Sequence, residues 1–236
     1  MQLWTRAHSP NSDTTRLETG LGSSVTMTLG FVCALYLAWT GAWILMAKLQ
    51  THFGWPSTSD AQTLYWVAMK LVLWIVPAIF VLRSLGMRVG DAMRGNGIAS
   101  ALLWGVGVGV LIGAEAVVRK WLGHQPYSFA LSWPMVNVVL VAPIVEELVF
   151  RGAVLGGLTR RYRFGVANVI ASLLFVGAHV PGWYFTGTLV QNLTIPLGGA
   201  LSIFVLGLIF GFVVLKSRSL AGGMIAHGIN NLFSVL

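Results

Sequence analysis

The chain has 236 residues, of which 56% are apolar and 9% charged, with a formal net charge of +8. A soluble domain carries roughly 25% charged residues, so this composition excludes a soluble globular protein and indicates a chain that lies mostly in a lipid bilayer. The positive charge does not indicate a nucleic-acid partner, because excess Lys and Arg in a membrane protein usually lie in cytoplasmic loops against anionic headgroups.

The chain begins with a polar segment, residues 1–25, which has no apolar core of its own and is therefore not expected to be a cleaved signal peptide. We expect this segment to be cytoplasmic. N-terminal transmembrane helices are expected in residues 26–132, and a C-terminal transmembrane core in residues 133–236.

Seven apolar segments follow, each close to the ~20 residues that a membrane span requires. In chain order they are 26–47, 62–82, 97–118, 133–158, 164–182, 188–215 and 219–236. The sixth is interrupted by IPLGG at 195–199, which allows a short or re-entrant piece before a full span. None shows the alternation of a barrel strand, and backbone groups in lipid must be satisfied within each segment. The predicted fold is an all-α bundle of seven or eight transmembrane helices.

The loops give an independent indication of topology. With the N-terminus placed inside, ten Lys and Arg lie on that side of the membrane and three on the other. Cytoplasmic loops carry the excess of positive charge, so we expect a cytoplasmic N-terminus, an external C-terminus and an odd number of full crossings.

Ionisable side chains at membrane depth are functional candidates, because each costs about 2.5–3.5 kcal/mol or more at the centre of a helix. They are Lys70, Glu115, Glu146, Glu147, Arg151, His179 and His227. Lys70 and Glu115 fall near the outer ends of the second and third segments. We expect these two to pair with each other, and the alternative is a substrate-binding role.

The stretch VEELVFRG at 145–152 holds three of these residues. Glu147 and Arg151 are four residues apart, so on a helix they share a face and can form an ion pair. Glu146 is rotated by about 100° from Glu147 and has no partner in its own helix. The spacing therefore predicts one supporting ion pair and one free carboxylate suited to a general base. The alternative is that all three residues only join helices together.

Two later segments carry further polar groups. His179 ends the stretch FVGAH, and His227 and Asn231 share one helix face in the stretch HGINN. A lone membrane histidine is often an interhelical hydrogen bond, but together with Glu146 these groups match a hydrolytic site with donors for an oxyanion. Glu146, His179 and His227 also match a zinc site, although the helical motif HExxH of soluble zinc proteases is absent.

The stretches EELVFR, FVGAH and HGINN fit the motifs EExxxR, FxxxH and HxxxN, in that order and each on its own segment. In this the chain resembles, over residues 133–236, the CAAX prenyl protease and bacteriocin-processing family, the intramembrane glutamate proteases also called the Abi family. The resemblance implies that Glu146 and His179 activate water, that His227 and Asn231 bind the oxyanion, and that the ion pair beside them supports the site. It leaves open whether zinc is used.

One point of geometry is unresolved by the sequence. By the expected boundaries Glu146 and His227 lie near the middle of the membrane, whereas His179 lies near the outer end of the fifth segment. We expect this segment to begin earlier, near Arg161, or the helices to be tilted or staggered. Pro143 and Pro181 could also displace the groups.

The predicted function is that of an intramembrane endopeptidase in a bacterial or archaeal plasma membrane. Its expected substrate is a prenylated or otherwise membrane-associated protein, or a peptide precursor. The first alternative is a non-catalytic immunity or scaffold protein of the same fold. The second is a proton-coupled transporter, for which the inverted repeats common in transporters are not visible.

Overall fold

The computed structural model describes residues 14–127 and 129–236. Every regular element in these ranges is helical, which confirms the predicted all-α class. The α-helices and the π-helices (η) are, in order, α1 (Thr14–Phe53), α2 (Ser59–Lys70), η1 (Leu71–Ile75), α3 (Val76–Ser84), α4 (Val89–Arg94), α5 (Ile98–Leu122), α6 (Trp133–Val136), η2 (Asn137–Val141), α7 (Ala142–Glu147), η3 (Leu148–Val154), α8 (Leu155–Leu158), α9 (Phe164–Gly177), α10 (Val180–Phe185), α11 (Leu189–Thr194), α12 (Ala200–Ser217) and α13 (Leu220–Val235).

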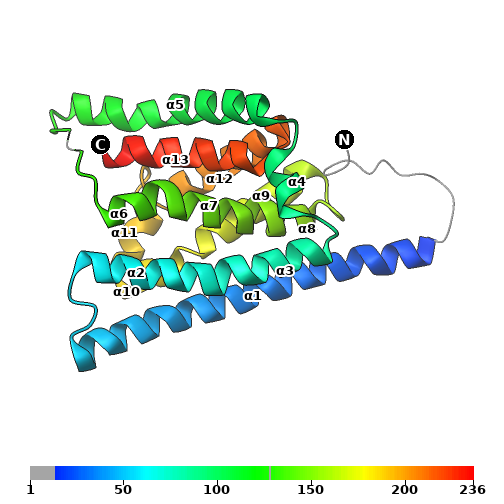
Figure 1. Ribbon diagram of the computed structural model, residues 1–236, viewed down its shortest axis with the longest axis horizontal. Helices are drawn as coiled ribbons and strands as arrows, with labels where there is room; N and C mark the ends of the chain where they lie inside the picture. Colours follow the sequence, from blue (N-terminus) through cyan, green and yellow to red (C-terminus); the bar gives the residue numbers. More distant parts are fainter. Residues whose placement is uncertain (1–13, 128) are drawn as a thin grey trace.

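In the described part of the chain these elements join into long helical runs that lie side by side along the long axis of the molecule (Figure 1). The runs coincide with the seven expected segments to within a few residues, except that α1 is longer at both ends. The sixth expected segment is divided, as the IPLGG interruption indicated, into the short α11 and the long α12.

Five helices among the described residues are long and apolar enough to cross a membrane. They are Ser24–Phe53, Ser59–Ser84, Ile98–Leu122, Phe164–Phe185 and Ala200–Ser217. The two other expected spans are also helical, but residues 133–158 carry three charged side chains and α13 has only 16 residues. The protein is an integral membrane protein built as a helical bundle.

Two of the runs contain a proline that follows a π-helical turn. The turn η1 precedes Pro77, and η2 precedes Pro143. Proline has no N–H and its ring clashes with the carbonyl four residues back, so a locally wider turn lets the helix continue. Lys70 lies directly before η1, and Glu146 lies in the short α7 between two such turns.

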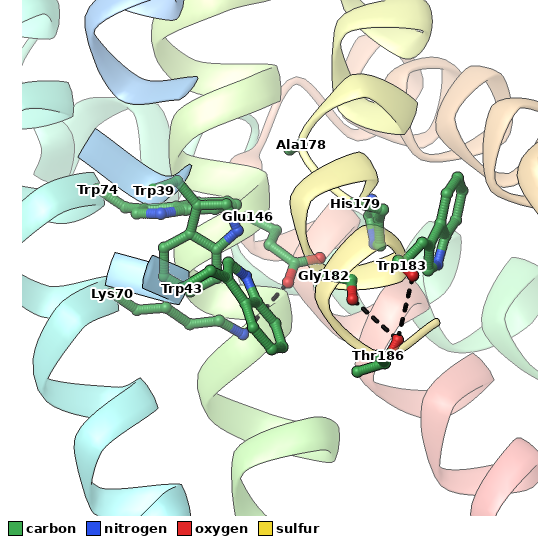
Figure 2. A pocket seen from close by; sticks show the side chains of 10 residues that line it. All are labelled: Trp39, Trp43, Lys70, Trp74, Glu146, Ala178, His179, Gly182, Trp183 and Thr186. Atoms are coloured by element: carbon green, nitrogen blue, oxygen red, sulfur yellow. Dashed lines mark hydrogen bonds and ion pairs between the residues drawn. The ribbon is translucent and has the colours of Figure 1, made fainter. Parts of the chain in front are cut away.

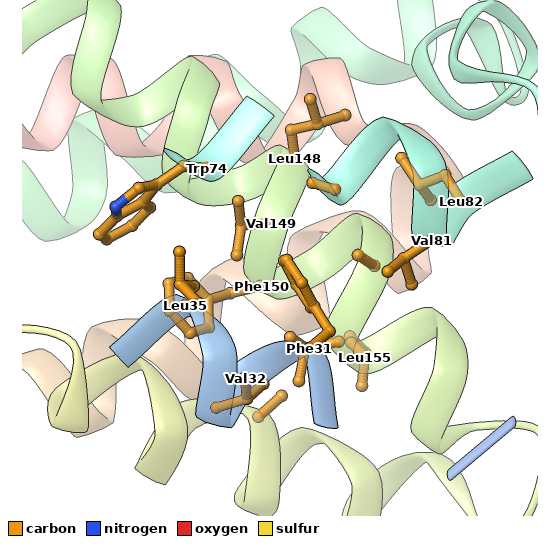
Figure 3. Packing of buried hydrophobic residues seen from close by; sticks show 14 of the residues in the cluster. Phe31, Val32, Leu35, Trp74, Val81, Leu82, Leu148, Val149, Phe150 and Leu155 are labelled. Atoms are coloured by element: carbon orange, nitrogen blue, oxygen red, sulfur yellow. The ribbon is translucent and has the colours of Figure 1, made fainter. Parts of the chain in front are cut away.

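The centre of the bundle is the run that holds α7, η3 and α8. Every residue from 142 to 158 except Ile144 is buried. Val149, Phe150 and Leu155 pack with side chains of α1 and α3, among them Phe31 and Leu82 (Figure 3). The charged residues of this run therefore lie inside protein and do not face lipid.

The last helix is held close to α5 by glycines. A side chain added at Gly105, Gly109 or Gly113 of α5 would collide with α13. Small residues allow membrane helices to approach closely, and here they seat the helix that carries His227 and Asn231.

Candidate active site

A cavity of about 280 Å³ lies between the N-terminal helices and the C-terminal half of the chain. Its lining comes from α1, α2, η1, α7 and the region of α10 (Figure 2): Trp39, Trp43, Lys70, Trp74, Glu146, Ala178, His179, Gly182, Trp183 and Thr186. The structure thus brings Glu146 and His179 to one cavity. The sequence analysis did not single out Trp39, Trp43 and Trp74 as residues of the site.

Glu146 has partners on two other helices. Lys70 Nζ lies 3.4 Å from Glu146 Oε1, and both side chains are 11% exposed. His227 Nε2 lies 4.0 Å from the other carboxylate oxygen, Oε2. Glu146 has no partner in its own helix, as predicted, but the prediction that it is a free carboxylate is wrong. A buried charge is costly without a counter-charge, and Lys70 supplies one from α2.

The predicted pair between Lys70 and Glu115 is also wrong. Glu115 Oε1 lies 3.1 Å from Arg119 Nε on the surface of α5, where the two side chains are 56% and 53% exposed respectively. These residues are four apart on one helix, so the spacing rule that predicted the Glu147–Arg151 pair applies here too. Lys70 faces the cavity instead.

His179 lies in the turn that joins α9 to α10. Its Nδ1 is 2.9 Å from the carbonyl oxygen of Phe175. Because a carbonyl oxygen only accepts, Nδ1 carries the hydrogen, and Nε2 of the neutral ring is left as an acceptor. The helix begins at Phe164, so an earlier start near Arg161 does not explain how His179 reaches Glu146. α9 ends at Gly177, and Pro181 lies in the first turn of α10 instead of ending a helix.

A second network lies beside the cavity and confirms the predicted ion pair. Arg151 Nη1 donates to Glu147 Oε1 at 2.9 Å, and Arg151 Nη2 donates to the Gly207 carbonyl at 3.0 Å. The Glu147 and Arg151 side chains are 0% and 1% exposed. His227 Nδ1 lies 3.0 Å from the same Glu147 oxygen, so Glu147 also orients His227, a role that the sequence analysis did not assign.

Aromatic rings surround this network. The Arg151 guanidinium lies 4.6 Å from the ring centre of Phe175, and the His227 ring stacks on Phe210 with 4.5 Å between ring centres. Contacts of this kind stabilise a cation and restrict the rotation of the imidazole. The FxxxH motif thus contributes Phe175 as a cover for Arg151 as well as His179.

Asn231 lies one turn beyond His227 on α13. Its Nδ2 donates to the Val138 carbonyl at 2.9 Å, and its Oδ1 accepts from Asn230 at 3.3 Å. Asn231 is not among the residues that line the cavity. Its role at an oxyanion stays a prediction.

The zinc site suggested by Glu146, His179 and His227 can be tested against the donor geometry. In residues 14–127 and 129–236 no group of three His, Cys, Asp or Glu side chains is arranged to hold a metal ion. The Lys70 ammonium occupies the space beside Glu146 Oε1, where it would repel a second cation. This arrangement does not fit a shared metal, and no step below uses one.

Fold and cavity together define an integral membrane protein in which a carboxylate and an imidazole line one cavity between the helices. Residues 128–233 match the family model described as type II CAAX prenyl endopeptidase Rce1-like. This match confirms the family resemblance that the three motifs indicated, and residues 128–233 are similar to a domain of that family. No curated protein and no solved structure matches the chain.

Proposed function

We propose that the protein is an intramembrane endopeptidase that hydrolyses a peptide bond in a prenylated or otherwise membrane-associated substrate. The observation that carries this proposal is that Glu146 and His179 line the same cavity, which has a volume of about 280 Å³. Hydrolysis of a peptide bond needs a base for water and a second group to position it, and these two side chains supply both.

In the proposed reaction, a water molecule in the cavity donates one hydrogen bond to Glu146 and the other to His179 Nε2. Glu146 accepts the proton as the water oxygen bonds to the carbonyl carbon of the substrate. When the carbon–nitrogen bond breaks, the proton passes from Glu146 to the departing amine. The hydrogen bond from His179 Nδ1 to Phe175 keeps the ring in the tautomer that this step requires.

The tetrahedral intermediate needs hydrogen-bond donors for its oxyanion. We assign this role to Asn231 and His227, which occupy successive turns on one face of α13. Because His227 Nδ1 donates to Glu147, Nε2 can donate to an oxyanion only when the ring carries a hydrogen on both nitrogens. The amide nitrogen of Asn231 carries two hydrogens, and the Val138 carbonyl accepts one of them. The second hydrogen is the one proposed to reach the oxyanion.

The walls of the cavity favour an apolar substrate. Trp39, Trp43, Trp74 and Trp183 line it, with Lys70 and Glu146 as the charged groups. Aromatic side chains bury large apolar surfaces, which suits a lipid-modified segment delivered from the bilayer. We further propose that the protein resides in a bacterial or archaeal plasma membrane with its N-terminus in the cytoplasm.

The His179→Ala variant provides the first test. We expect the rate of cleavage of a farnesylated CAAX peptide in proteoliposomes to fall by about 100-fold or more, since water loses its positioning acceptor. New C-termini would be measured by mass spectrometry. His52→Ala, at an exposed position near the end of α1, is the matched control and should cleave at the wild-type rate.

Two results would contradict the proposal. One is an unchanged rate for folded His179→Ala. The other is a wild-type protein that cleaves neither the peptide nor any protein of its own membrane. The second result would be established by comparing C-termini in membranes with and without the active protein.

Metal removal gives a separate prediction. Since Lys70 lies beside Glu146 and the donors do not group around one point, incubation with EDTA or 1,10-phenanthroline should leave the cleavage rate within about twofold of the untreated rate. The untreated protein would also be assayed for bound zinc by mass spectrometry. Loss of activity on chelation that is restored by added zinc would contradict the metal-free site.

A further inference from the structure

We infer that Lys70 is a positioning residue for Glu146, so that the site is completed by a helix outside the matched domain. This inference rests on the proposed function. Residues 128–233 carry the family match, whereas Lys70 is the last residue of α2. Figure 2 shows its side chain reaching toward the Glu146 carboxylate from the wall opposite His179.

Lys70 is the one Lys or Arg side chain among the described residues that line the cavity. Arg151, the other buried cation near the site, is held by Glu147 and by the Gly207 carbonyl. The charge of Glu146 is therefore balanced by Lys70. Lys70 is 9% exposed, and at membrane depth an ammonium group is retained only where a partner stabilises it.

The two oxygens of Glu146 have different neighbours. Oε1 faces the ammonium group of Lys70 at 3.4 Å, and Oε2 faces His227 Nε2 at 4.0 Å. The hydrogen bond from Lys70 restricts the rotation of the carboxylate, and the more distant His227 adds a weaker contact on the other side. Without Lys70 the carboxylate keeps only the longer contact with His227, and it can turn away from the water that His179 positions.

The length of the contact is compatible with a base. Tight charge-assisted hydrogen bonds between N and O are about 2.7–2.9 Å, as in the Glu147–Arg151 pair at 2.9 Å. The Lys70 contact of 3.4 Å is longer and involves one oxygen. It orients Glu146 and leaves lone pairs free to accept a proton. Glu147, by contrast, receives Arg151 and His227 on Oε1, is 0% exposed and does not line the cavity.

The local helix geometry brings Lys70 to the cavity. Lys70 and Trp74 are four residues apart and both line it, so this face of α2 and η1 forms a wall of the site. The π-helical turn begins directly after Lys70, at Leu71. Wider turns of this type are frequent at functional sites, because they change the face that the following residues present.

The test compares Lys70→Met with Lys70→Arg in proteoliposomes, with kcat and KM measured separately. Lys70→Met should lower kcat about 10- to 100-fold, because the base loses its orientation, while KM changes by less than about threefold. Lys70→Arg, which retains the cation, should recover most of this loss. Lys48→Met, at an exposed position on α1, is the matched control and should resemble the wild type.

A second measurement separates positioning from a purely structural effect. Unfolding of Lys70→Met, Glu146→Gln and the double variant is followed in detergent, and kcat is corrected for the folded fraction. If the two residues interact, the effects of the single substitutions on the unfolding equilibrium constant do not combine independently. We expect the constant of the double variant to differ by at least about fivefold from the value that the two single variants predict. A folded Lys70→Met protein with wild-type kcat, or additive effects in the unfolding cycle, would overturn the inference. An inactive wild-type protein would instead count against the proposed function.

Discussion

Replacing Glu146 by Gln is expected to lower the rate of peptide cleavage by roughly 1,000-fold or more, with little change in the amount of membrane-inserted protein. Glutamine fills the same space and can still accept a hydrogen bond from Lys70, but it cannot take a proton from water. The rate of appearance of the cleaved peptide in proteoliposomes measures the loss. Glu115→Gln, which changes an exposed carboxylate on α5, should leave the rate unchanged.

The neutral amide leaves the Lys70 ammonium without its counter-charge, so a second variant is needed beside Glu146→Gln. The double variant Glu146→Gln with Lys70→Met removes both charges and should be folded and equally inactive. Replacement of a buried ion pair by uncharged side chains is often neutral for stability. Residual cleavage above about one tenth of the wild-type rate in either folded variant would rule out Glu146 as the base.

The largest expected effect on stability comes from Arg151→Met. This change leaves the Glu147 carboxylate, at 0% exposure, without its cation, and removes the side-chain hydrogen bond from Arg151 to the Gly207 carbonyl. Removing one partner of a buried ion pair costs about 3–5 kcal/mol, and we expect the free energy of unfolding to fall by that amount. Reversible unfolding of the purified protein in detergent micelles would measure it.

The chain contains a matched control for this experiment. Glu115 and Arg119 have the same Glu–Arg spacing of four residues, but their side chains are 56% and 53% exposed. Arg119→Met should change the free energy of unfolding by less than about 1 kcal/mol, because water screens an exposed pair. If Arg151→Met and Arg119→Met lower the free energy of unfolding equally, the burial of the Glu147–Arg151 network does not matter for stability.

Much of the fold could be predicted from the sequence, because each membrane span must satisfy its own backbone and is therefore visible as an apolar segment. The Glu147–Arg151 pair was predictable for a similar reason, since its geometry is set within one helix. The contacts of Lys70 with Glu146 and of His227 with Glu147 were not. They depend on how each helix is rotated and how deeply it lies against its neighbours, which apolar spacing does not determine.

The enclosure of residues 142–158 also bears on how the protein is made. If this helix entered the bilayer alone, its charged side chains would meet lipid, each at a cost of about 2.5–3.5 kcal/mol near the helix centre. Arg151 and Glu147 belong to the same helix and enter the bilayer together. Lys70 is synthesised 76 residues before Glu146. His227 follows Glu147 by 80 residues. During synthesis, the partner of Glu146 is thus available first, and we expect this helix to insert against α2 before the remainder of the bundle closes around it.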